Sequence, residues 1–302
     1  MWSVGKPITT GQEYIESLRN RKLSVYLFGE QIDDPVEHPI IRPSINALAE
    51  TYDLTQTNPE LATAVSPYTG EKINRFLHIA ENADDLVKQN KMQRKLGQLT
   101  GTCFQRCVGM DAINSLHSVT YDMDQKYQSD YHQRFLSFLT MVQNGGFVIS
   151  GAMTDVKGNR NLLPHQQSDP DLYVRVVDRN DEGVFIRGAK AHQTGCINSH
   201  WIVVMPTLRL TEEDKEYAIV GAIPVDAKGI TYVYGRQSSD TRHLEESTID
   251  TGNQKFSGQE ALVIFEDVFI PNEFIFMDGE FEFAAPLVER FTCYHRRSYV
   301  CK

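Results

Sequence analysis

The chain has 302 residues, a formal net charge of −10 and a pI near 5.4. This length can bury a substantial core in about two domains, and the acidic balance argues against nucleic-acid binding, which needs a basic face. No apolar run reaches the roughly 18 residues of a transmembrane helix, and an odd count of five cysteines favours a reducing compartment over a disulfide scaffold. We therefore expect a soluble, cytoplasmic protein with neither a nucleic-acid nor a membrane partner.

The first 145 residues have patterns typical of helices. Thr10-Gly11-Gln12-Glu13 has the form of a capping box, which begins a helix. Apolar residues three and four apart predict a second helix through residues 73–80. Three further helices are expected, over residues 88–99, 110–119 and 131–142. Gly145-Gly146 ends the last of them, as glycine does at helix C-termini.

Short runs of β-forming residues follow, separated by turn formers such as those at 178–183. The runs lie at 147–150, 172–177, 184–186, 201–205, 217–220 and 262–265. They predict an all-β domain over residues 146–278, built as a small barrel or a sandwich. Helical spacing returns from Glu280 on, so residues 279–302 begin another helical segment. The expected class is α+β: an N-terminal helical domain (1–145), the β domain, and the start of a C-terminal helical domain.

Four residues are candidate ligands of an iron–sulfur cluster: Cys103, Cys107, His295 and Cys301. Thiolates are the usual ligands of such clusters, and a histidine can replace one. On a helix, Cys103 and Cys107 would share one face at about 100° per residue. Buried cysteines that act as small hydrophobic residues also have this spacing, so the spacing alone leaves both interpretations open.

Two polar segments next to predicted strands are candidate flavin contacts. Met153-Thr154-Asp155-Val156-Lys157-Gly158-Asn159-Arg160 offers backbone amides and a hydroxyl to a ring edge, and Arg160 could meet a pyrophosphate. An ordinary polar turn has the same composition. Lys190-Ala191-His192-Gln193-Thr194-Gly195 is similar. Because the sequence has no GxGxxG motif, a dinucleotide would have to bind outside a Rossmann fold.

Three further side chains are candidates for acid–base chemistry. Glu260 stands where a strand begins and could be a general base if burial raises its pKa; the alternative is a solvated turn residue. Tyr299 follows His295 by four residues and could share a helical face with it, or could be a packed aromatic. Lys302 could pair with a substrate or an acid, or could be solvated.

These segments together resemble one known family across essentially the whole chain. The stretches that carry the resemblance are 103–111, 151–155, 187–194, 258–263 and 294–296. They look like the 4-hydroxybutyryl-CoA dehydratases, which are also vinylacetyl-CoA isomerases and belong with the 4-hydroxyphenylacetate 3-hydroxylase flavoproteins. The resemblance implies an acyl-CoA dehydrogenase-like architecture. The cysteine motif is specific to the dehydratases, whereas the flavin segments are shared with the hydroxylases.

The resemblance also implies FAD and a [4Fe–4S] cluster. The implied cluster ligands are Cys103, Cys107, His295 and Cys301. The implied FAD contacts are Met153, Thr154, Asp155, Lys157, Arg160, His192, Gln193 and Thr194. The implied catalytic residues are His295 and Tyr299 for proton transfer, Glu260 for an acid–base role, and Lys302.

The implied reaction removes water from 4-hydroxybutyryl-CoA to give crotonyl-CoA, with vinylacetyl-CoA isomerisation, in anaerobic fermentation. The C3 hydrogen is unactivated, and a transient one-electron oxidation by the flavin would acidify it, while a cluster iron acts as Lewis acid on the departing hydroxyl. The family implies a homotetramer that binds an acyl-CoA substrate.

Two alternatives stay open at this point. A flavin-dependent aromatic hydroxylase would need no cluster. An inactive, truncated fragment is the second, because the family's C-terminal helical domain is largely absent and only Val300 separates Tyr299 from Cys301, where the family has two glycines. On a helix, this shorter spacing leaves His295 and Cys301 about 120° apart.

Overall fold

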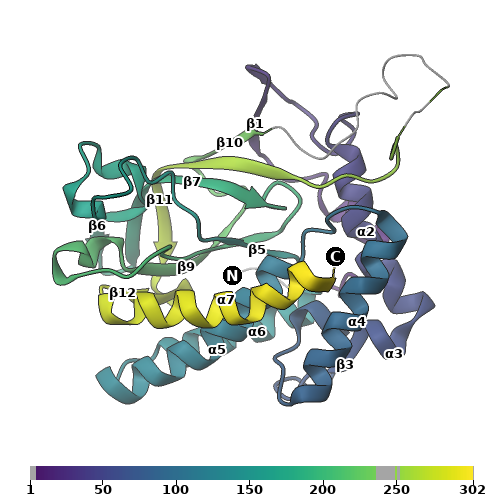
Figure 1. Ribbon diagram of the computed structural model, residues 1–302, viewed down its shortest axis with the longest axis horizontal. Coiled ribbons are helices and arrows are strands. Elements are labelled where there is room, and N and C mark those ends of the chain that lie inside the picture. The colour runs from purple at the N-terminus through teal and green to yellow at the C-terminus, as the bar shows by residue number, and fades with distance from the viewer. Residues whose placement is uncertain (1–4, 236–248, 250–251, 302) are drawn as a thin grey trace.

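The computed structural model describes residues 5–235, 249 and 252–301, without the side chains of residues 299–301. Two β-sheets lie together at one side of the molecule, and helices pack below and beside them (Figure 1). Among the described residues, no helix combines the length and apolarity needed to cross a membrane.

The larger sheet has six strands in the order β2-β1-β10-β11-β7-β6. Its strands are β1 (Ser24–Leu27), β2 (Glu30–Gln31), β6 (Arg175–Asn180), β7 (Gly183–Thr194), β10 (Ile230–Tyr234) and β11 (Glu260–Pro271). Its neighbours are antiparallel except for β1 and β10, which are parallel. The two long strands β7 and β11 pair over almost their whole length.

The second sheet has four strands in the order β12-β9-β8-β5. They are β5 (Ile149–Ala152), β8 (Trp201–Val204), β9 (Ile219–Pro224) and β12 (Ile275–Asp278). A separate small hairpin joins β3 (Thr63–Val65) to β4 (Lys72–Asn74). Within the described residues, both larger sheets end in edge strands, so the barrel alternative is wrong, whereas the mixed helix-and-sheet class is confirmed.

The two sheets stack through alternating side chains. On β8, Ile202 and Val204 enter the core shared with the larger sheet, whereas Trp201 and Val203 enter a core shared with helices, as period-two alternation requires. A Cβ built on Gly221 of β9 would lie 3.1 Å from Ile270 of β11. The Ile270 side chain therefore packs directly on the β9 backbone at this glycine.

Helices cover the free face of the four-stranded sheet and extend beyond it. They are α1 (Gly11–Ser17), α2 (Arg42–Thr57), α3 (Pro59–Ala62), α4 (Ala83–Thr100), α5 (Cys107–Tyr127), α6 (Tyr131–Gly145) and α7 (Ala284–Cys301). In Figure 1, α7 runs beneath the sheets beside α5, and its end approaches α4. A separate apolar cluster joins α2, α4 and the start of α5 through Leu54, Leu96, Phe104 and Met110.

Most of the helices expected from the sequence are present. The capping box is confirmed, because the Thr10 side chain accepts from the Glu13 N–H and the Glu13 carboxylate accepts from the Thr10 N–H. The helices expected at 88–99, 110–119 and 131–142 are parts of α4, α5 and α6. Gly146 ends α6 in the left-handed conformation, with φ of 63°.

The helix expected at residues 73–80 is wrong. This stretch contains the end of β4 and a 3-10 turn, Arg75–Leu77. The Asn74 side chain caps the turn by accepting from the Phe76 N–H. Ile73 and Leu77 enter one apolar core and Phe76 enters another, so the spacing does not mark a single helical face. The predominantly helical first half also supplies β1 and β2 to the larger sheet, two strands that the sequence pattern did not predict.

The approach of α5 to β5 gives a first test. A Cβ on Gly109 of α5 would lie 2.0 Å from the Ile149 carbonyl oxygen, whereas one on Gly97 of α4 would meet no atom within 4 Å. We expect Gly109→Ala to lower the free energy of unfolding by about 1–3 kcal/mol through overpacking. The control Gly97→Ala should raise it by about 0.5–1 kcal/mol, since alanine favours a helix. Urea denaturation measures both, and equal effects would contradict the close contact.

Candidate functional site

The two cysteines lie where α4 gives way to α5. Gly101 ends α4 with φ of 61°, and α5 begins at Cys107. Gln105 has φ of 68°, which turns the backbone between the cysteines. The expectation that they share one helical face is therefore wrong: Cys103 lies in the connecting loop, residues 101–106, and Cys107 opens the helix. The positive end of a helix favours a thiolate.

Gln105 fastens this cysteine loop to the rest of the molecule. Its Nε2 donates to the Ser44 carbonyl at 2.8 Å, and its Oε1 accepts from Asn198 Nδ2 at 2.7 Å. A Cβ on Gly195, one residue beyond β7, would lie 2.8 Å from the Gln105 Cβ. The loop thus packs directly against Gly195, the residue that follows the candidate flavin residues 192–194.

Arg106 is a buried cation within the same loop. Its guanidinium lies 4.8 Å from the Tyr52 ring centroid and 5.0 Å from that of Phe76, and it donates to Thr51 Oγ1 at 3.1 Å. Burial lowers the pKa of Arg106. Within the described residues it has no carboxylate partner, and its Nη2 makes no hydrogen bond. A buried, uncompensated positive charge suits an anionic group bound nearby.

His295 reaches α5 from α7. Its Nδ1 lies 2.9 Å from Oδ2 of Asp111, a fully buried residue one helical turn beyond Cys107. This contact places the candidate ligands Cys107 and His295 on two adjoining helices. The helix α7 continues to Cys301, but the side chains of Tyr299 and Cys301 and the whole of Lys302 lie outside the described residues.

The first candidate flavin segment, residues 153–160, is fixed by a buried ion pair. Lys190 Nζ of β7 lies 2.7 Å from Asp155 Oδ1 and donates to the carbonyls of Met153 at 2.9 Å and Met205 at 2.7 Å. Burial raises the pKa of Asp155 and lowers that of Lys190. The Asp155 side chain therefore holds the segment against β7 rather than facing a solvent-filled cavity.

The two candidate flavin segments lie side by side. The Thr154 carbonyl accepts from the Ala191 N–H at 2.8 Å and from Gln193 Nε2 at 2.9 Å. Lys157 and Arg160 line a cavity of about 280 Å³ on the exposed side of the first segment. No ion pair engages either of these two cations within the described part of the chain.

Glu260 joins the second segment through strand pairing. It stands opposite Thr194 in the β7–β11 ladder, with Thr194 Oγ1 3.5 Å from Oε1 and His192 Nδ1 3.8 Å from Oε2. Its side chain is 46% exposed and that of His192 is 80% exposed. Glu260 thus lacks the burial on which the general-base hypothesis relied, but it lies among the candidate cofactor residues.

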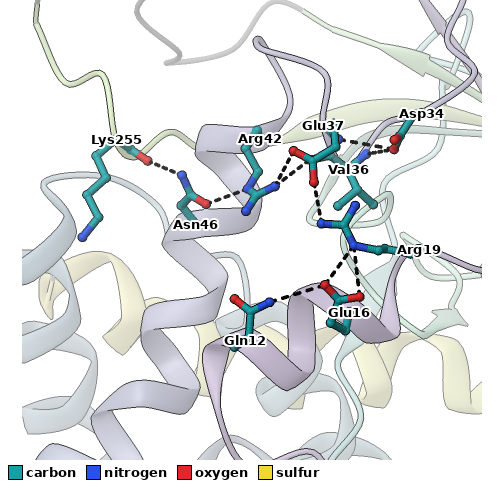
Figure 2. A network of polar contacts seen from close by, with 9 residues as sticks. All are labelled: Gln12, Glu16, Arg19, Asp34, Val36, Glu37, Arg42, Asn46 and Lys255. Carbon is teal, nitrogen blue, oxygen red and sulfur yellow. Dashed lines mark hydrogen bonds and ion pairs between the residues drawn. The ribbon is translucent and has the colours of Figure 1, made fainter.

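A polar network joins α2 to the chain at Lys255, a few residues before Glu260 (Figure 2). Asn46 of α2 donates from Nδ2 to the Lys255 carbonyl at 3.1 Å and accepts from Arg42 Nε at 3.0 Å. Arg42 also donates to Glu37 at 2.8 Å. Asn253 donates to the Thr100 carbonyl at the end of α4, at 2.8 Å. The cysteine loop, the end of β7 and the start of β11 therefore converge on one region.

Sequence reasoning singled out these segments but missed the side chains that join them. Gln105 and Asp111 lie within the quoted cysteine stretch, yet neither was given a role. The available signal was Asp111, a carboxylate one helical turn after Cys107. The partners of Gln105 are 61 and 93 residues away in sequence, so no local pattern indicates them.

Two stacked open sheets flanked by helices, with polar segments that follow β5 and end β7, define a mixed helix-and-sheet protein. The family model described as 4-hydroxyphenylacetate 3-hydroxylase N terminal matches residues 10–277. This chain belongs to that family.

Similar proteins agree with this assignment. A 4-hydroxybutyryl-CoA dehydratase/vinylacetyl-CoA-Δ-isomerase of Clostridium aminobutyricum is 53% identical over 97% of this chain and 60% of its own. The structure of an oxygen-tolerant archaeal 4-hydroxybutyryl-CoA dehydratase from N. maritimus is 68% identical, with a TM-score of 0.95, over 97% of this chain and 59% of that one. The FAD complex of the oxygenase component of 4-hydroxyphenylacetate 3-monooxygenase is 21% identical, with a TM-score of 0.76, over 98% of this chain and 62% of that one, and shares the fold. The chain thus spans about three fifths of the length of these relatives.

The attachment of the cysteine loop gives a second test. We expect Gln105→Ala to lower the free energy of unfolding by about 1–3 kcal/mol, because it leaves buried partners such as Asn198 unsatisfied. Gln98→Ala, at an exposed position of α4, is the matched control and should change stability by less than about 0.5 kcal/mol. Thermal and urea unfolding provide the measurement. A tolerated Gln105→Ala would remove Gln105 as the anchor of the loop.

Proposed function

We propose that this chain provides the cluster- and flavin-binding part of a 4-hydroxybutyryl-CoA dehydratase that also isomerises vinylacetyl-CoA. The observation that carries the proposal is the convergence of the cysteine loop, the end of β7 and Glu260 through the Gln105 and Asn253 contacts. The dehydratase names of the relatives with 53% and 68% identity support the same reaction.

The residues fit the proposed cluster. Cys103 and Cys107 bracket a loop that ends at a helix N-terminus, and Arg106 adds a buried positive charge without a carboxylate partner among the described residues. Both features suit thiolates and an anionic cluster. His295 would be the third ligand and Cys301 the fourth, in the Cys3His set that the family resemblance implies.

The residues also fit a flavin dinucleotide. Thr154 and Gln193 bind each other through a backbone carbonyl, which aligns their two segments into one surface. Lys157 and Arg160 would meet a pyrophosphate beside the cavity that they line. His192 and Thr194 would contribute contacts from β7. The FAD complex of the related oxygenase supports this choice of cofactor.

When bound, the flavin would supply a one-electron oxidation and a cluster iron a Lewis acid. The chain's own groups would position the acyl-CoA substrate and move protons. Glu260 and His192, both exposed and adjacent, would exchange a proton with a substrate bound at the end of β7. Thr194 would orient the Glu260 carboxylate. Tyr299 and Lys302 keep their proposed catalytic roles, and a cytoplasmic homotetramer is the proposed assembly.

An aromatic hydroxylase is the less supported alternative. It would use the flavin segments but no cluster, and it would leave the ordered cysteine loop and the His295–Asp111 contact unused. An inactive fragment is the other alternative. Cofactor content separates all three hypotheses.

The cluster ligands give a third test. The protein purified without oxygen should hold about four irons and acid-labile sulfides and one FAD per chain. Cys103→Ala should lose most of the iron, whereas Cys293→Ala, at an exposed position of α7, should keep it. Iron, sulfide and flavin analysis gives the result. Full iron in the Cys103 variant would refute the ligand assignment; flavin without iron would favour the hydroxylase, and neither cofactor would favour the inactive fragment.

The role of Glu260 gives a fourth test. If it transfers a proton, Glu260→Gln should lower the rate of 4-hydroxybutyryl-CoA dehydration by about 10²- to 10⁴-fold, with cofactor content unchanged. Glu266→Gln, at an exposed position of the same strand, is the control and should keep full activity. An unaffected Glu260 variant would limit this residue to a structural role.

A further inference from the structure

Asp111 is a buried carboxylate whose donors, among the described residues, all come from α7. It is fully buried on α5 and lies 2.9 Å from His295 Nδ1, 3.2 Å from Ser298 Oγ and 3.4 Å from Arg297 Nη2. Leaving a carboxylate in an apolar core is costly unless hydrogen bonds or a cation compensate it. Here the compensation is a set of three donors from neighbouring residues of α7, so the carboxylate holds this part of α7 against α5.

The contact with His295 determines which ring nitrogen carries the proton. Because an ionised carboxylate can only accept, the imidazole must donate from Nδ1. In the neutral ring, the lone pair then lies on Nε2, on the opposite side from Asp111. Histidines that bind metals commonly donate their other ring N–H to a carboxylate, which sets the tautomer and the ring orientation.

We propose that Asp111 is the positioning residue that holds His295 as the Nδ1-protonated tautomer and presents Nε2 to an iron of the cluster. This inference rests on the proposed function, which supplies the ligand role of His295. It adds a residue that acts through the histidine and does not itself touch the cluster.

The position of Asp111 on α5 gives this arrangement its rigidity. Asp111 follows Cys107 by four residues, so one helical turn carries both a thiolate ligand and the acceptor for the histidine ligand. A helical turn has a fixed geometry, and it therefore sets the separation of the Cys107 sulfur from the His295 ring. The His295 ring also stacks on Phe291, with ring centroids 5.2 Å apart, which restrains its tilt from its own helix.

A purely structural role for Asp111, as an anchor of α7, is the competing explanation. Two substitutions separate the roles. Asp111→Asn keeps the size of the side chain, but its amide can either accept from the histidine or donate an N–H to it. The histidine is then no longer restricted to the Nδ1-protonated tautomer. Ser298→Ala removes a neutral donor of the same carboxylate and leaves the Asp111–His295 contact in place, so it serves as the matched control.

The first measurement is ¹⁵N NMR of the cofactor-free protein labelled at its nine histidines, with His295→Gln to assign the signal. We expect the Nδ1-protonated pattern for His295 in the wild type and in Ser298→Ala, and a mixture or the Nε2-protonated form in Asp111→Asn. An Nε2-protonated His295 in the wild type, or an unchanged tautomer in Asp111→Asn, would overturn the proposal.

The second measurement is cluster binding in protein reconstituted without oxygen, followed by iron titration and by the electron paramagnetic resonance spectrum of the reduced cluster. Asp111→Asn should bind the cluster about 10- to 100-fold more weakly and with an altered spectrum. Ser298→Ala should match the wild type even if both variants lose a similar amount of thermal stability. Equal weakening in the two variants would leave Asp111 as an anchor of α7 and overturn the positioning role.

The two readouts also distinguish the failure of this inference from that of the proposed function. Suppose that the wild-type protein takes up no cluster, while His295 is Nδ1-protonated and its tautomer changes in Asp111→Asn. The proposed function then fails, but Asp111 still determines the tautomer of the histidine. If the cluster binds and the tautomer is insensitive to Asp111, only the inference fails.

Discussion

The seating of the start of α5 on the two sheets is the constraint on which the rest of this structure depends. At Gly109 the helix meets the backbone of β5 with no room for a side chain, and at Gln105 the preceding loop meets the chain just after β7. These two contacts fix the first turn of α5 relative to both candidate flavin segments. They therefore also fix Cys107 and Asp111, and through Asp111 the end of α7.

Four buried charged residues in this region are compensated in three different ways. Asp155 and Lys190 form a closed pair in which backbone carbonyls accept from the remaining ammonium protons, so their demand for partners is met within the fold. Asp111 relies on donors from another helix, and one of them is a titratable ring. Arg106 has aromatic faces and one hydroxyl but no described carboxylate. The first arrangement is that of a structural pair; the other two suit a bound group that completes them.

The sequence predicted the elements whose stabilising contacts are local. α4 and α6 follow from amphipathic spacing, and α1 from its capping box, because these signals lie within a few residues of each other. β1 was missed because a four-residue strand carries little pattern of its own and is defined by its parallel partner β10, about 200 residues away. The stretch 73–80 has helical spacing, but its apolar side chains serve two cores, which only the tertiary structure can reveal.

The candidate site likewise has a part that local motifs predict and a part that depends on contacts between distant residues. Motifs identified the cysteines, the two flavin segments and Glu260, since each is a short run of chemically suited residues. Their convergence depends on Gln105, Asn198 and Asn253, polar residues whose partners are distant in sequence.

The shared position of Cys107 and Asp111 on one turn of α5 has a further consequence. A group that binds both Cys107 and His295 would tie α7 to α5 by a covalent bridge in addition to the hydrogen bonds at Asp111, so its binding energy would add to the stability of the folded chain.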